Sequence, residues 1–473
     1  MDNRKDSAPR PVNPRRRKRS RLQTFKEAYL PAILAGAALL LILIFIIGSI
    51  ARSAQKKKDQ EQARYEASVS LENEMNRLAG ESKELIAQAK ALAANYDYEA
   101  ALQVLNTFTG NMNDFPELLT VYQQYQDAKS KLVLWDDPSK VTSLSFQLLI
   151  ADPVRAFNDA NYSTSFKKNF VTTEEFSKIL TSLYENGYIL VSIDDFITEE
   201  TTPTGATVYK AKPLYLPEGK KPLLLTQTNV NYNLYLVDSD GDLVPDKNGS
   251  GFASRLVVNS DGSVTCEMVD STGSTVTGDF DLVPILDKFV DAHPDFSYRG
   301  AKAVLALTGY NGLFGYRTQA SAEQVLGSVA YQQEIDNAKA VATALRNNGY
   351  QLTCYTYDNA AYGDRSLVQI QADLAEWTAE VQPILGQLDV LVYALNSDIG
   401  NQNPYSGEKF DYLHSYGFRY FLGFCENGTP WTSVTDDYVR IGRILVGGAN
   451  ISQNPDWFAG MFNASVLDPA RNG

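Results

Sequence analysis

Histidine and cysteine are the scarcest reactive residues in this 473-residue chain. The two histidines, His293 and His414, lie 121 positions apart, so the sequence contains no His-x-x-x-His pair. Because catalytic zinc usually draws on several histidines, the composition disfavours a zinc site. The cysteines, Cys266, Cys354 and Cys425, are odd in number and widely spaced. They therefore indicate isolated buried thiols, not a disulfide framework or a zinc knuckle.

Acidic residues are nearly missing from the first 58 positions, where 14 Lys/Arg stand against 3 Asp/Glu, a net charge of +11. The whole chain carries −13, so residues 59–473 carry −24. An acidic body repels phosphates, which argues against nucleic acid as a partner. At 473 residues, the chain is also too long for one ordinary domain.

Charge is absent between residues 28 and 51, where 24 residues read AYLPAILAGAALLLILIFIIGSIA. At ~1.5 Å per residue they give roughly 36 Å of helix, enough to cross the hydrocarbon core of a membrane. The apolar core of a cleaved signal peptide, the alternative, is shorter, about 7–15 residues. Ten Lys/Arg precede the span and four follow closely. We predict a single-pass protein of the cell membrane, with the basic tail, 1–27, in the cytoplasm and the body outside.

Residues 52–138 have the apolar periodicity of helices. Within them, AQAKALAANYDYEAALQVLNTF sets alanine and leucine at helix-packing spacings around two tyrosines. This stretch resembles one tetratricopeptide-type helix pair, and a plain helical stalk is the alternative.

From residue 139 to the end, strand patterns alternate with helix patterns. The run VTTEEFSKILTSLYENGYILVSIDDF predicts a helix, capped by Thr172 or Thr173 with Glu175 nearby, and then a strand over 189–193. The same unit recurs in IDNAKAVATALRNNGYQLTCYTY and in VQPILGQLDVLVYAL. Such alternation predicts an α/β fold with a mostly parallel sheet, either a barrel or open.

In order and spacing, four runs resemble the polysaccharide deacetylase (NodB-homology) family over roughly residues 141–465. They are TTEEFSKILTSLYENGYILVSIDDF, KPLLLTQTNVNY, GYQLTCYTYDN and WTAEVQPILGQLDVLVYALNSDIG. A further run, residues 280–318, resembles an insert of a membrane-anchored bacterial branch of the family. The resemblance implies a distorted (β/α) barrel over 139–473 that removes acetyl groups from N-acetylated sugars. It also implies a metal held by one Asp and two His, with a second Asp as base.

The positions that would carry this chemistry hold hydroxyl and amide side chains. Thr228 stands at the base position and Asn229 at the position of the metal-binding Asp, while Tyr355 and Asn359 stand at the two His positions. A His common in this branch is replaced by Gln147. Amide oxygens hold zinc poorly, and tyrosine would bind only as phenolate, whose unperturbed pKa is ~10. We predict no catalytic residues and no zinc here.

This pattern predicts a membrane-anchored, catalytically inactive deacetylase-like protein that binds cell-wall or surface glycan or scaffolds envelope proteins. The alternative is an active hydrolase that deacetylates N-acetylated polysaccharide through a divergent site. A third candidate is an interaction protein that acts through its helical stalk. Asp358, Asp364 and Asp398 lie near the expected barrel mouth, where two carboxylates could support glycoside hydrolysis, although solvated loop acids are the simpler interpretation.

An acidic loop, DSDGDLVPD, is a candidate calcium site. It places Asp238, Asp240, Asp242 and Asp246 at positions 1, 3, 5 and 9, a spacing that crowds oxygens into a turn. The Glu at position 12 of an EF-hand loop is missing, and an acidic surface turn is the alternative.

Three residues are candidates for contact with substrate: Arg299, Tyr310 and Arg317. The runs SYRG and GYRT place the two arginines beside tyrosines. Tyrosine and arginine suit stacking on a sugar and contact with a carboxylate, and ordinary packing of barrel loops is the alternative.

Overall fold

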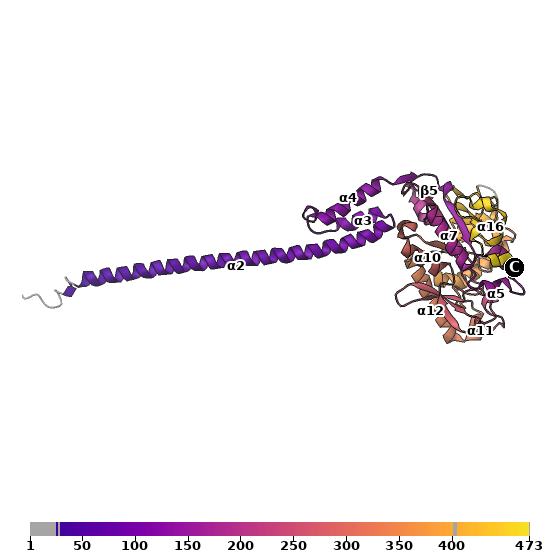
Figure 1. Ribbon diagram of the computed structural model, residues 1–473, viewed down its shortest axis with the longest axis horizontal. Coiled ribbons are helices and arrows are strands. Elements are labelled where there is room, and N and C mark those ends of the chain that lie inside the picture. The colour runs from indigo at the N-terminus through magenta and orange to yellow at the C-terminus, as the bar shows by residue number, and fades with distance from the viewer. Residues whose placement is uncertain (1–24, 27–28, 401–403, 473) are drawn as a thin grey trace, which may run out of the picture. The chain divides into compact units, whose positions relative to one another are not determined.

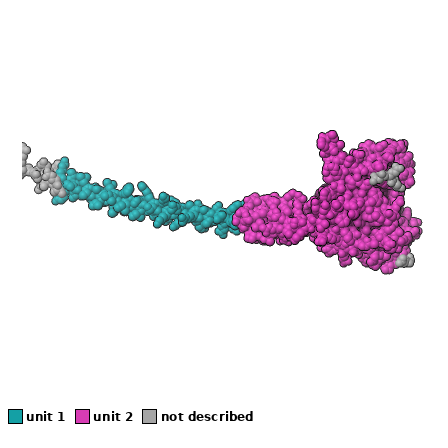
Figure 2. All heavy atoms as spheres, turned by 90° about the horizontal axis from the view of Figure 1, so that it is seen from above, with its two compact units in different colours: residues 1–82 teal, residues 83–473 magenta. Residues whose placement is uncertain are grey.

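The computed structural model describes residues 25–26, 29–400 and 404–472. The chain divides into two compact units, Met1–Ser82 and Lys83–Gly473 (Figure 2). Nearly all of the predicted basic tail, 1–27, lies outside the described residues. The predicted stalk, 52–138, extends across both units.

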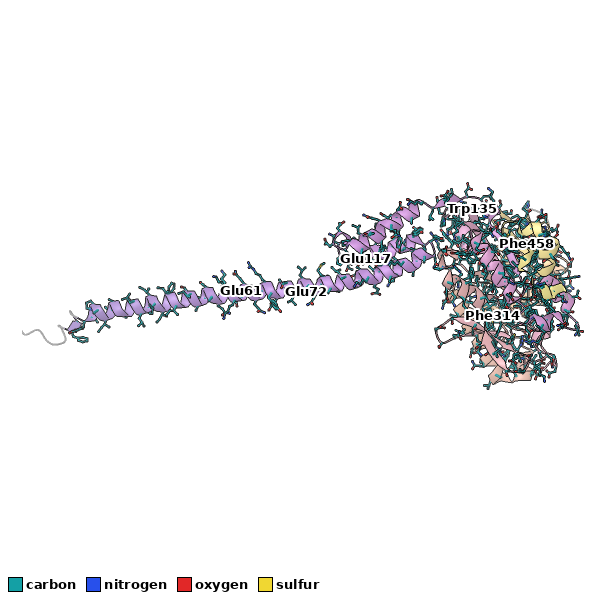
Figure 3. The ribbon with its side chains drawn as sticks, in the orientation of Figure 1. Glu61, Glu72, Glu117, Trp135, Phe314 and Phe458 are labelled. Carbon is teal, nitrogen blue, oxygen red and sulfur yellow. The ribbon has the colours of Figure 1, made fainter. Side chains whose placement is uncertain are left out.

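The longest element is helix α2 (Leu30–Ala94), which has 65 residues (Figure 1). Its first part is apolar, with a mean hydropathy of 3.0 and none of that stretch buried. By length and composition it could cross a membrane, as predicted for residues 28–51, and its orientation stays a prediction. Farther along, charged side chains such as Glu61 and Glu72 project from the helix (Figure 3) and are exposed.

Helices α3 (Tyr98–Asn106) and α4 (Pro116–Ser130) follow α2 and pack against each other. Buried side chains recur at helical spacing on these two helices and on the last turns of α2: Ile86 and Ala89 on α2, Ala101 and Leu105 on α3, and Leu118, Val121 and Tyr125 on α4. The helices predicted for residues 52–138 are therefore present, and their likeness to a tetratricopeptide pair stays a prediction.

In the described residues, seven parallel strands close into a barrel. In chain order and around the ring they are β2 (Thr142–Phe146), β7 (Lys221–Thr228), β11 (Ala303–Leu307), β12 (Gln351–Cys354), β13 (Val390–Val392), β14 (Tyr420–Phe424) and β16 (Val439–Leu445). Pairing of β16 with β2 closes the ring and removes its free edges. The predicted (β/α) barrel is confirmed.

The barrel strands are largely buried on both faces because one face lines the interior and the other packs against the surrounding elements. On β7, Leu223 and Leu225 belong to the outer layer of the core, whereas Leu224 lies in the interior cluster. On β16, Val439 and Ile441 lie in the interior cluster. The strand therefore directs its odd-numbered residues inward.

Helices separate successive barrel strands along the chain up to β14, whereas only strand β15 (Trp431–Val434) lies between β14 and β16, and helix α16 follows β16. The longer ones are α6 (Ser163–Asn169), α7 (Thr173–Glu185), α10 (Leu282–Ala292), α12 (Ser328–Asn347), α13 (Leu367–Glu376), α15 (Glu408–Tyr416) and α16 (Gly448–Gln453). The shorter ones are α5 (Pro153–Phe157), α8 (Ile193–Phe196), α9 (Leu234–Val237), α11 (Ala322–Leu326) and α14 (Gln382–Leu385).

Antiparallel strands add to this frame. They are β1 (Val133–Trp135) with β6 (Leu214–Leu216), β4 (Ile197–Thr201) with β5 (Thr207–Ala211), and β8 (Arg255–Val258), β9 (Val264–Val269) and β10 (Thr275–Gly278). Strand β15 (Trp431–Val434) pairs with β16. Strand β3 (Tyr188–Leu190) lies parallel to the start of β7.

Helix α7 begins as the sequence predicts. The Thr172 hydroxyl accepts the Glu175 N–H at 3.1 Å, and the Glu175 carboxylate accepts the Thr172 N–H at 2.7 Å, which forms a capping box. The strand that follows is shorter than predicted, ending at Leu190, because Ser192 caps a new helix, α8.

The prediction that residues 280–318 form an insert is wrong in one respect. This segment contains β11, which lies between β7 and β12 and is part of the barrel itself. Its five residues are all buried, as expected of a parallel strand covered on both faces.

Candidate functional site

The carboxyl-terminal ends of the seven barrel strands form one rim, which we call the mouth. Thr228 ends β7, and Asn229 follows it. Tyr355 and Asn359 follow β12, and only β11 separates β12 from β7. Parallel strands end on the same side of a sheet, so all four positions belong to the mouth, where barrel enzymes place their chemistry.

Thr228 and Tyr355 are enclosed at the mouth, with exposed fractions of 1% and 2%. The Thr228 hydroxyl lies 3.3 Å from the Phe146 carbonyl oxygen and 3.3 Å from Gln147 Oε1. The Tyr355 hydroxyl accepts the Leu395 N–H at 3.4 Å. Burial raises the pKa of Tyr355. Near neutral pH this side chain is therefore a neutral phenol, which is a poor metal ligand.

A buried guanidinium occupies the barrel interior. Arg443, on β16, is fully buried and donates to Ser145 Oγ at 3.0 Å and to the Gly423 carbonyl at 3.1 Å. A weaker contact, 3.4 Å, reaches the Leu422 carbonyl. Within the described part of the chain, no carboxylate forms an ion pair with it. Burial lowers the pKa of Arg443 to about 10, and interaction with Tyr355 opposes that shift.

This arrangement places a positive charge in the barrel interior, near Tyr355. The Arg443 guanidinium is charged near neutral pH and interacts electrostatically with Tyr355. Like charges in a low-dielectric interior repel strongly. The barrel interior therefore disfavours a second cation.

Strained backbone gathers in the loops of the mouth. In the described residues, Asn229, Thr356, Asn359, Leu395 and Asn396 have φ of 62°, 66°, 49°, 53° and 60°. Residues other than glycine rarely adopt this region, and such strain persists only where the surrounding structure fixes it. The Oδ1 atoms of Asn229 and Asn359 are also buried without a hydrogen-bond partner. The loops after β7, β12 and β13 therefore combine strained backbone with buried, unpartnered amide oxygens.

The side chains present do not fit the metal that the resemblance implies. The four positions offer one hydroxyl, one neutral phenol and two amides, with no carboxylate and no imidazole. His293 packs against the rings of Tyr184 and Phe289, with centroid distances of 4.5 and 4.7 Å. His414 lies on α15 with Nε2 3.3 Å from the Asp437 carbonyl. Neither histidine belongs to the mouth positions.

Two of the three acids predicted near the barrel mouth, Asp398 and Asp364, accept hydrogen bonds from neighbouring loop and strand residues. Asp398 accepts Arg440 Nη2 at 3.0 Å and the Tyr405 hydroxyl at 2.5 Å. Asp364 accepts the Ser397 hydroxyl at 2.9 Å. The Asp364–Ser397 contact joins the loops after β12 and β13, and the Asp398–Arg440 contact joins the loop after β13 to β16.

The third loop acid, Asp358, follows β12. Its backbone N–H donates to the carboxylate of Asp373, which also accepts the Tyr357 N–H. Burial and the nearby charge of Asp373 raise the pKa of Asp358.

An open cavity of about 900 Å³ lies beside the mouth, at the ends of β14 and β16. We call it the β14–β16 cavity. Its lining includes two indoles, several amides and an ion pair: Trp431, Trp457, Asn396, Asn427, Asp398 and Arg440. The four positions of the resemblance do not line it. Sequence reasoning missed this site, although two of the four tryptophans of the chain flank or follow the last barrel strand.

The predicted substrate-contact residues do not come together. Tyr310 follows β11 at the mouth and is 53% exposed. Arg317 is 3% exposed and donates to the carbonyl oxygens of Asn311 and Tyr232, at 2.8 and 3.1 Å. Its guanidinium therefore holds a loop together. Burial lowers the pKa of Arg317 to about 10.

Arg299 lies at the other end of the same strand. It precedes β11, and its N–H donates to the Asn95 carbonyl at 2.9 Å. Its guanidinium lies 3.7 Å from Asp97 and 3.8 Å from Glu99. Arg299 thus binds the helical segment near α3, on the side of the barrel opposite the mouth.

The acidic loop brings three of its four predicted residues together. Ligand oxygens of Asp238, Asp240 and Asp246 lie within 4.8 Å of one another, and Asp242 is outside this group. Asp238 accepts backbone N–H groups, including that of Leu243 at 2.9 Å. The carboxylates thus stabilise the turn itself, and calcium binding stays a prediction.

No family model and no curated protein matches the chain. The chain is similar to a deacetylase of Streptococcus pyogenes solved in complex with acetate, at 12% identity and a TM-score of 0.34, over 70% of this chain and 100% of that one. It is also similar to a polysaccharide deacetylase from Bacillus cereus, at 11% identity and a TM-score of 0.34, over 67% of this chain and 68% of that one. The side chains of the mouth must therefore carry the functional conclusion.

Proposed function

We propose that this protein is a membrane-anchored, extracytoplasmic barrel protein of deacetylase type that binds cell-wall or surface glycan without hydrolysing it. The observation that carries the proposal is the chemistry of the mouth. A neutral phenol, Tyr355, and a hydroxyl, Thr228, are enclosed there, and the charge of Arg443 lies in the interior.

Hydrolysis of an acetamide needs an activated water molecule and a group that takes its proton. Loss of a general base alone typically costs ~10²–10⁴-fold in rate. The metal that supplies hydroxide near neutral pH has no suitable ligands at Asn229, Tyr355 or Asn359. The two losses together support a non-catalytic role.

Retention of ligand binding is supported by the strained loops of the mouth and by the open cavity beside it. Strain in a folded protein costs roughly 1–3 kcal/mol per residue, and it collects at sites that hold ligands in a defined geometry. The mouth has therefore lost its chemistry but keeps the framework of a binding site.

Contact with envelope proteins is a second candidate. It is favoured by Leu71 and Met75 on α2, whose side chains are 66% and 42% exposed. The alternative is a hydrolase that acts through a divergent site, and detection of its activity would replace the proposal.

The test uses the full chain in lipid nanodiscs. Sedimentation with insoluble peptidoglycan and with chitin should retain the protein, and acetate release from the same polymers, followed by proton NMR, should stay at the level of empty nanodiscs. Retention on neither polymer would contradict glycan binding. Sustained acetate release that a chelator abolishes would identify an active enzyme.

A further inference from the structure

The β14–β16 cavity has the composition of a carbohydrate site. Its volume, about 900 Å³, lies in the range of about 300–1,000 Å³ that small-molecule sites occupy. Among its lining residues, Trp431 and Trp457 are partly exposed. Indole rings offer flat apolar surfaces and one N–H donor, which match the C–H faces and hydroxyl groups of pyranose rings.

The indole rings of Trp431 and Trp457 each pack directly against the backbone of a glycine. A Cβ at Gly442, which is paired with Trp431 across β15 and β16, would collide with the Trp431 ring. A Cβ at Gly428 would collide with the Trp457 ring. Each ring therefore has a fixed backing, and such preorganisation lowers the entropic cost of binding a flexible ligand.

Arg440 holds one wall of the cavity. Its guanidinium lies over the ring of Tyr405, 3.8 Å from the centroid, and 5.2 Å from the centroid of the Trp431 ring. Its ion pair with Asp398, 3.0 Å long, joins β16 to the loop after β13. The two charges largely cancel, so this wall offers hydrogen bonds without a strong field.

The remaining polar lining is also close to neutral. Lys168 and Glu426 contribute one charge of each sign. Asn396 and Asn427 add amides that can both donate and accept. Burial raises the pKa of Cys425 to about 12, so its thiol stays protonated. The balance favours a ligand with hydroxyl and amide groups over a polyanion or a polycation.

We propose that the β14–β16 cavity binds an uncharged oligosaccharide, with Trp431 and Trp457 as its stacking surfaces. The inference rests on the proposed glycan-binding function and moves the binding site from the four mouth positions to the ends of β14 and β16. Ligand binding then needs none of the groups that deacetylation would require.

Calorimetric titration of the full chain tests the inference. The protein is held in nanodiscs, because detergents with sugar headgroups would compete. The probes are neutral tetramers of N-acetylglucosamine, glucose and mannose, and the tetramer of glucosamine as a charged counterpart. At least one neutral tetramer should bind, and the glucosamine tetramer should bind more weakly than the tetramer of N-acetylglucosamine.

Three variants locate the site. Trp457→Ala removes one stacking ring and should weaken binding of the neutral tetramer about tenfold or more. Ala449→Phe fills the cavity from α16 without deleting a contact and should have a similar effect, which covers the case in which Trp457→Ala does not fold. Trp135→Phe, on β1 and outside the cavity lining, should leave binding unchanged.

The outcomes separate the two proposals. Wild-type binding that survives both Trp457→Ala and Ala449→Phe would overturn the cavity as the site and leave the proposed glycan-binding function intact. Wild-type protein that binds none of the neutral tetramers would overturn both. Tighter binding of the glucosamine tetramer would overturn the preference for uncharged ligands.

Discussion

Replacement of Arg443 by methionine isolates the effect of an unpaired charge inside the barrel. The lowered pKa of Arg443, about 10, corresponds to roughly 3 kcal/mol of unfavourable burial of its charge. Methionine relieves that cost but leaves Ser145 Oγ and two backbone carbonyls without a donor, at about 1 kcal/mol for each lost hydrogen bond. The opposing effects are similar in size. We expect the free energy of unfolding to change by less than about 2 kcal/mol.

Arg440→Met is the matched control. Arg440 lies on the same strand and is similarly buried, with 6% of its side chain exposed, but it pairs with Asp398 at 3.0 Å. Breaking this pair leaves the partly buried Asp398 carboxylate without its counter-ion, which should cost about 3 kcal/mol. Urea unfolding of the full chain, followed by tryptophan fluorescence and circular dichroism, compares the two variants. Equal destabilisation by Arg440→Met and Arg443→Met would refute the assignment of Arg443 as an unpaired charge.

Three further predictions follow from other contacts. Glu175→Gln breaks the buried 2.5 Å ion pair with Arg471 and should lower the free energy of unfolding by about 3–5 kcal/mol. The control Glu174→Gln changes an exposed residue and should alter that free energy little, so equal effects of the two variants would contradict the burial argument. Burial raises the pKa of Asp281, so wild-type stability relative to Asp281→Asn should be greatest at low pH and fall as pH rises through that raised pKa; thermal melts from pH 4 to 7 would contradict this if the difference stayed constant. If the acidic loop binds calcium, about 0.1–1 mM calcium should raise the melting temperature of the wild-type protein. Asp238→Asn should abolish this shift and Asp242→Asn should preserve it, because Asp242 lies outside the cluster of carboxylates; absence of a shift in the wild-type protein would refute the calcium site.

Much of the barrel is readable from local sequence. The alternation of helix and strand patterns predicts the (β/α) fold, and the Thr172–Glu175 capping box marks the start of α7. The apolar run Leu223–Leu225 predicts the strand that ends at Thr228, and the resemblance to the deacetylase family assigns Thr228 and Asn229 to the positions of the base and the metal-binding Asp.

The two arginines of β16 show where local pattern is insufficient. Arg440 and Arg443 are three positions apart and so point to opposite faces of a strand. Which face becomes the interior depends on the pairing of β16 with β2, and Arg443 contacts Ser145, 298 residues earlier. No local signal carries that pairing.

The two Tyr-Arg motifs show how failure to predict strand β11 led to an error in the candidate site. Arg299 and Arg317 have similar neighbours in sequence, but they lie on either side of β11, toward opposite ends of the barrel. Because residues 280–318 were interpreted as an insert, that strand, and with it the difference between the two arginines, was not predicted.

The most direct test of the account is a turnover measurement with metal supplied. The full chain in nanodiscs, loaded with zinc, cobalt or manganese in turn, is incubated with the tetramer of N-acetylglucosamine, and released acetate and bound metal are quantified together. We expect bound metal far below one ion per chain, and released acetate no higher than from empty nanodiscs. The reason is that the four mouth positions, Thr228, Asn229, Tyr355 and Asn359, supply neither a base nor suitable metal ligands. One metal ion per chain together with repeated turnover would contradict it.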